Sequence, residues 1–73
     1  MKVKFINVGS NNMNWTANLQ SLSFRELERQ IKSKGALMSR TLDFIFDEES
    51  QKGNIIVGVF RKVGEFEVVE TTS

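Results

Sequence analysis

The sequence predicts a small α+β domain in which one amphipathic helix packs on one face of a mostly antiparallel sheet, in the order ββαβββ. Residues 22–35 combine helical spacing of apolar residues with a capping signal at each end. The other apolar stretches alternate with polar residues or form short β-branched runs, and both patterns are typical of strands. With 73 residues, the chain is expected to form one domain (1–73), ordered over 1–70 with a frayed tail at 71–73.

The helix is expected at about residues 24–34. Ser23 has the chemistry of an N-cap, and Glu26 stands three residues later to complete a capping box. Gly35 can adopt the left-handed conformation that ends many helices. The apolar positions fall on one stripe: Phe24, Leu27 and Ile31.

Two strands are expected before the helix, at residues 2–8 and 13–20. The four residues between them are Gly, Ser and Asn, which favour turns, so a hairpin is the simplest arrangement. The second strand alternates apolar and polar residues without interruption. In the first strand, one face is expected to hold Val3 and Phe5 and the other Ile6 and Val8.

Three strands are expected after the helix. Residues 41–47 alternate, whereas 47–54 form a polar stretch that predicts a loop. The run 55–60 is continuously apolar around Gly58, which predicts a central strand buried on both faces. The glycine indicates a bulge or a close approach of other backbone. A tight turn with Gly64 at positive φ is expected over 61–64, followed by a last strand at 65–70. The helix is expected to cover these residues: Val3, Phe5, Met13, Trp15, Leu42, Phe44, Phe46, Ile55, Val57 and Val59.

The composition argues against an enzyme. The chain has no His and no Cys, so it lacks the commonest general base, the strongest nucleophile and the usual ligands of tight metal sites. Two carboxylate pairs are candidates for acid–base chemistry, Asp43 with Asp47 and Glu65 with Glu67, but such spacing on strands is typical of a solvated face. The acidic run 47–49 lacks the alternating ligands of a calcium loop. We expect no catalytic residue, cofactor, metal or small-molecule substrate.

The chain also lacks the marks of a membrane or exported protein. No segment approaches the roughly 20 apolar residues of a membrane span. The basic start of the chain is followed by an apolar run too short and too alternating for a signal peptide. A cytoplasmic protein without a membrane partner is therefore expected.

Four apolar residues remain on the face opposite the helix: Ile6, Ile45, Ile56 and Phe60. No second helix is predicted to cover them. A strongly twisted sheet could hide them, and isolated exposed apolar residues are common. If they are contiguous, they form the kind of patch that marks an interface. Because so small a domain needs extra burial, we predict a non-catalytic, adaptor- or inhibitor-like interaction module that binds a protein partner or forms a homodimer.

Nucleic-acid binding is the alternative. Arg25, Arg29 and Lys32 cluster within about 60° on the exposed side of the helix, where they could contact phosphates. Glu26 and Glu28 flank this stripe, and the sequence pI of about 8.1 is below that of domains that bind nucleic acid by charge. Nucleic acid is therefore the less favoured partner.

Overall fold

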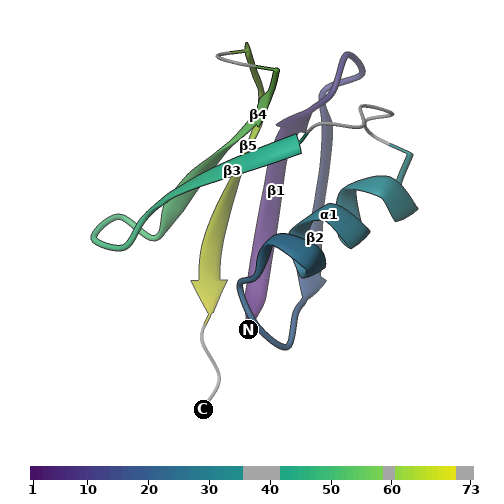
Figure 1. Cartoon of the computed structure of the whole chain (residues 1–73). Coiled ribbons are helices and arrows are strands. Elements are labelled where there is room, and N and C mark those ends of the chain that lie inside the picture. The colour runs from purple at the N-terminus through teal and green to yellow at the C-terminus, as the bar shows by residue number, and fades with distance from the viewer. Residues whose placement is uncertain (36–41, 59–60, 71–73) are drawn as a thin grey trace.

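The computed structural model describes residues 1–35, 42–58 and 61–70. It confirms a small, compact α+β domain in the order ββαβββ, with a five-stranded antiparallel sheet and one helix (Figure 1). The strands pair in the order β2-β1-β5-β4-β3. Their bounds are β1 (Lys2–Val8), β2 (Met13–Asn18), β3 (Leu42–Asp47), β4 (Lys52–Val57) and β5 (Arg61–Glu70), and the helix is α1 (Phe24–Ser33). The predicted tail at 71–73 lies outside the described residues.

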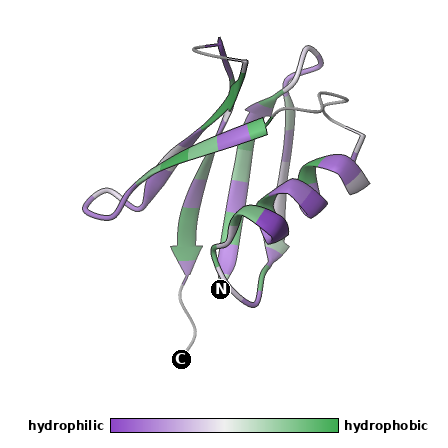
Figure 2. Cartoon of the chain, viewed as in Figure 1, coloured by the Kyte–Doolittle hydropathy of each residue, from purple (hydrophilic) through white to green (hydrophobic). Residues whose placement is uncertain are grey.

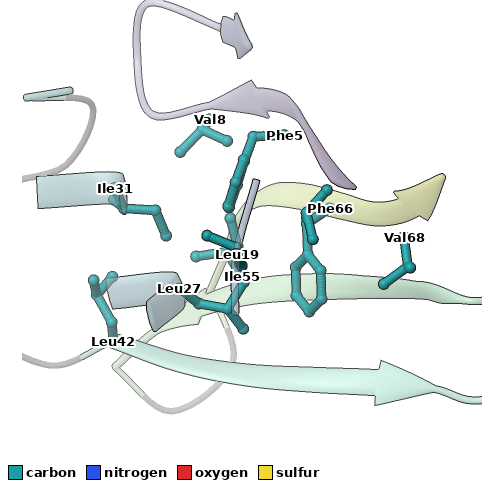
Figure 3. Packing of buried hydrophobic residues seen from close by; sticks show 10 residues of the cluster. Phe5, Val8, Leu19, Leu27, Ile31, Leu42, Ile55, Phe66 and Val68 are labelled. Carbon is teal, nitrogen blue, oxygen red and sulfur yellow. The ribbon is translucent and has the colours of Figure 1, made fainter. Parts of the chain in front are cut away.

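The domain has two layers. Figure 1 shows α1 in front of β1 and β2, whereas the β3–β4 hairpin reaches away from the helix on the opposite side. In Figure 2 much of the visible ribbon of α1 has the colour of hydrophilic residues. Between the layers lies one apolar core (Figure 3), formed by Val3, Phe5, Val8, Leu19, Leu27, Ile31, Leu42, Ile55, Phe66 and Val68. Phe66 and Val68 of β5 belong to this core, although neither is predicted in it from the sequence.

Both predicted helix ends are confirmed. The Ser23 Oγ accepts a hydrogen bond from the backbone N–H of Glu26 at 3.3 Å. At the other end Gly35 has φ +67°, and its N–H donates to the carbonyl oxygen of Lys32 at 3.1 Å. This is one of the two bonds of a Schellman ending. The second involves residue 36, which lies outside the described residues.

The apolar stripe of α1 is only partly buried. Leu27 and Ile31 are fully in the core, whereas Phe24 is 50% exposed. The Phe24 ring nevertheless packs edge-on against Phe44, with ring centroids 5.1 Å apart. The first turn of the helix therefore lies at the margin of the core.

The β1–β2 hairpin is confirmed, but the predicted orientation of Val8 is wrong. Val8 is fully buried on the core face and does not share the face of Ile6. Between the pairs Phe5↔Trp15 and Val8↔Met13 the first strand contains one extra residue. This bulge includes Asn7 at φ +50°. A bulge reverses the alternation beyond it, which turns Val8 inward.

The predicted limits of β4 are also wrong. The strand includes Lys52 and Gly53, which are expected in a loop, and it stops at Val57. Gly58 has φ +64° and lies beyond the strand, so it forms no bulge within it, and nothing lies within 4 Å of its Cβ position. The strand lies inside the sheet, between β5 and β3, as predicted, but it is not buried on both faces, because its outward-facing Ile56 is only partly buried. Residues 59–60 lie outside the described residues.

The predicted turn at 61–64 does not exist. Residues Arg61–Glu70 form one strand, β5, which lies at the centre of the sheet between β1 and β4. Gly64 is buried within it and has no positive φ. A Cβ at this position would lie 3.0 Å from the Cα and Cγ2 of Val8. The glycine therefore allows β1 to approach β5 closely. This requirement depends on residues far apart in the sequence.

Candidate interaction surface

The sheet face turned away from α1, here called the outer face, carries two well-defined rows of side chains. The strand pairing sets Ile6 of β1 beside Glu65 of β5, Asn54 of β4 and Ile45 of β3 in turn. We call these four residues the isoleucine row. Two residues along each strand lies a second row, the charged row, made of Lys4, Glu67, Lys52 and Asp47.

The isoleucine row crosses a concavity of about 410 Å³. Ile6 and Ile45 both line it, one from each end of the row. Ile45 is 60% exposed, the most exposed of the large hydrophobic residues in the part of the chain that is described. Glu65 and Asn54 lie between the two isoleucines, so the apolar side chains flank a polar centre.

The charged row alternates in sign across the sheet. Lys52 Nζ lies 3.7 Å from Glu67 Oε2, which joins the two middle residues of the row. At one end, Lys4 is exposed and has no ion pair or side-chain hydrogen bond with any described residue. At the other end, Asp47 Oδ1 accepts the backbone N–H of Glu49 at 3.0 Å, a bond within the β3–β4 turn. Neither end of the row forms an ion pair with a described residue, so both can meet an opposite charge on a partner.

Of the other two predicted interface residues, Ile56 and Phe60, the structure describes only Ile56. Ile56 lies on the outer face between Asp43 and Lys62, and it is partly exposed. The Lys62 Nζ lies 2.6 Å from the Glu65 Oε1. Phe60 lies outside the described residues. The structure therefore brings Ile6 and Ile45 to one concavity, with Ile56 further along the same face.

The sequence alone does not reveal the part that charged residues play on this face. The period-two alternation within 65–67 places Glu65 and Glu67 on one side of a strand. What it does not reveal is that Lys4 and Lys52 flank Glu67, because this depends on the strand order β1-β5-β4 and on register. The charged row is a property of pairing across the sheet.

The basic stripe of α1 is exposed as predicted, with Arg25, Arg29 and Lys32 all at the surface. Lys32 Nζ lies 3.8 Å from Glu28 Oε2, the expected pair one turn apart. Arg25 and Arg29 form no ion pair with any described residue. Two of the three cations therefore remain available to a phosphate.

The candidate carboxylates are spread along the sheet. Asp43 Oδ1 accepts the N–H of Phe44 at 2.8 Å, and Glu65 and Glu67 are each paired with a lysine. In residues 1–35, 42–58 and 61–70, no three acidic side chains gather where they could hold a metal ion. Over the same ranges, no helix is both long and apolar enough to cross a membrane.

Comparison with protein-family models, with curated proteins and with solved structures gives no significant match. The outer face and the basic stripe must therefore be interpreted from their own chemistry.

Proposed function

We propose that this chain is a small, non-catalytic protein–protein interaction module that self-associates through the outer face of its sheet. The observation that carries the proposal is the exposure of Ile45, 60%, at the rim of a concavity that Ile6 also lines. The helix covers the opposite face, and no described element covers this one. Exposed apolar residues around a concavity are characteristic of binding surfaces.

The energetics favour association of modest strength. Fully burying an isoleucine side chain contributes about 1.5–3 kcal/mol, and a symmetric dimer would bury two from each copy. A standard interface takes about 800 Å² from each partner. That is about one sixth of the 5018 Å² surface of this chain. Such an interface needs most of one sheet face, so the charged row would lie within it.

Sedimentation of the full chain across micromolar concentrations tests the proposal. We expect a concentration-dependent dimer, and Ile45→Ser should weaken it by about tenfold or more. Phe24→Ser is the control, because Phe24 is 50% exposed and lies on α1, away from the outer face. A wild-type chain that remains monomeric, with a melting temperature independent of concentration, would contradict the proposal.

Nucleic-acid binding is the second candidate, and the unpaired Arg25 and Arg29 support it. Replacing either arginine by alanine should lower the salt dependence of binding by about one unit of slope. Lys32→Ala should have a smaller effect, because this lysine already forms an ion pair with Glu28. Absence of salt-sensitive retention on heparin would eliminate this candidate.

A further inference from the structure

The order of charges across the outer face restricts how two copies can meet. From β1 to β3 the charged row is positive, negative, positive, negative: Lys4, Glu67, Lys52, Asp47. An alternating row with an even number of members is complementary to itself when it is turned end for end. The isoleucine row has the same property, because it has an isoleucine at each end.

Two kinds of two-fold axis would stack the outer faces, and they differ in electrostatic outcome. An axis that runs along the charged row would place Lys4 opposite the partner subunit's Lys4, so like charges would meet. An axis parallel to the rows but between them would set the charged row against the isoleucine row, so no charge would meet an opposite charge. An axis parallel to the strands, passing between β5 and β4, reverses the row. Lys4 then faces the partner subunit's Asp47, and Glu67 faces the partner subunit's Lys52. Only the axis parallel to the strands makes the charges attractive.

We infer that the partner is a second copy of this chain, docked face to face about a two-fold axis parallel to β4 and β5. This inference rests on the proposed self-association and adds its geometry. The same rotation that joins Lys4 to the partner subunit's Asp47 sets Ile6 against the partner subunit's Ile45. Apolar residues therefore meet apolar residues, and opposite charges meet, in a single arrangement.

The interactions within one copy agree with this arrangement. The middle of the charged row is already satisfied by the 3.7 Å pair of Lys52 and Glu67. Lys4 lacks such a pair among the described residues, so it gains one in the dimer. The concavity lies between the row ends, and two facing concavities leave space for water above Glu65 and Asn54. Hydration of these polar groups avoids the cost of burying them without hydrogen bonds.

Sheet twist is compatible with the pairing. Packed sheets cross at about 30°. The row ends lie roughly 7 Å from the axis, because strands are spaced by about 4.8 Å. A crossing of 30° therefore displaces them by less than about 4 Å, which the long Lys4 side chain can span.

Charge exchange tests this geometry. Lys4→Glu places two carboxylates together in a homodimer, and Asp47→Lys places two ammonium groups together. Each variant alone should dimerise about tenfold or more weakly than the wild type, measured by sedimentation at low salt. Mixed in equal amounts, the two should form a heterodimer of nearly wild-type affinity, because both contacts are then between opposite charges. Arg29→Glu, the same charge change on α1, should leave association unchanged.

Folding of the variants is verified separately, because Asp47 also accepts a hydrogen bond in the β3–β4 turn. If the Asp47→Lys variant has a lower melting temperature than the wild type, a mixture of Lys52→Glu and Glu67→Lys repeats the charge exchange in the middle of the row. A wild-type monomer would overturn both the inference and the proposed function. If the wild type dimerises but the charge variants dimerise equally well, and mixing them does not raise the affinity, the two-fold geometry is overturned. Self-association itself would then still stand.

Discussion

The two faces of the sheet use alternate residues of the same strands, yet they differ sharply in chemistry. On the face beneath α1, Phe5, Phe66, Gly53 and Phe46 pair in a row across β1, β5, β4 and β3. One residue along each strand lies the charged row of the outer face. The aromatic row has ring centroids 6.5 Å and 6.0 Å apart, and the Phe66 ring occupies the space above Gly53.

This difference separates folding from association. The aromatic row is complete within one chain, because Phe5 and Phe66 are almost fully buried and the glycine makes room for a ring. The charged row is incomplete, because one of its ends has no ion pair among the described residues. Substitutions on the inner face should therefore change stability, whereas those on the outer face should change association.

The largest effect is expected at Phe66. Phe66→Ala should lower the free energy of unfolding by about 3–5 kcal/mol, because it removes a buried ring and leaves a cavity. A chain of 73 residues is expected to have only roughly 4–11 kcal/mol in total, so the substitution should remove a large part of the stability. Urea denaturation followed by circular dichroism measures this loss. The adjacent outer-face change Glu67→Ala is the control and should cost less than about 1 kcal/mol. Equal losses at the two positions would refute the separation of the faces.

The next effect is expected at Gly53. A Cβ at this position would overlap the Phe66 ring and approach the carbonyl oxygen of Ile45 to 2.6 Å. Gly53→Ala should therefore cost about 3 kcal/mol through overpacking, measured as a lower urea midpoint. Gly58→Ala is the comparison, because nothing lies within 4 Å of its Cβ position and only its φ of +64° opposes the change. About 1 kcal/mol is expected there. A smaller loss at Gly53 than at Gly58 would show that the ring moves aside.

The parts of the fold that could be predicted are those that depend on residues close together in the sequence. The helix was predictable to its caps, because Ser23 and Gly35 act on backbone groups within one turn. The first hairpin and β3 follow from local alternation. The inward turn of Val8 was not predictable, because it depends on a bulge that alternation does not reveal.

The errors in β4 and β5 have a common, non-local cause. Glycine is typical of loops, but Gly53 and Gly64 lie inside strands. At both positions, atoms of other residues occupy the space that a Cβ would need. The Phe66 ring lies over Gly53, and Val8 lies against Gly64. The isoleucines of the candidate surface were predictable as outward-facing, whereas the charges between them depend on strand order.

A moderate effect is expected at the cap of the helix that covers the inner face. Ser23→Ala removes the acceptor of the Glu26 N–H, which should cost about 0.5–2 kcal/mol. For a domain of this size, each kcal/mol of lost stability lowers the melting temperature by roughly 4–8 °C. Ser21→Ala is a suitable control, because Ser21 is exposed and lies before the cap. An unchanged melting curve for Ser23→Ala would mean that another group satisfies the amide.

The smallest effect on folding is expected from the pair in the middle of the charged row. Lys52 and Glu67 lie 3.7 Å apart, and the lysine side chain is 67% exposed. Water and salt screen such pairs, and ordering two long side chains offsets part of the attraction. A double-mutant cycle with Lys52→Ala and Glu67→Ala, measured on the monomer at low concentration, should give a coupling of about 0.2–0.5 kcal/mol. At dimer-forming concentrations the coupling should grow, because each residue then also faces the opposite charge on the second copy. A coupling that is large in the monomer and independent of concentration would assign this pair to folding, and the outer face would lose its distinct role.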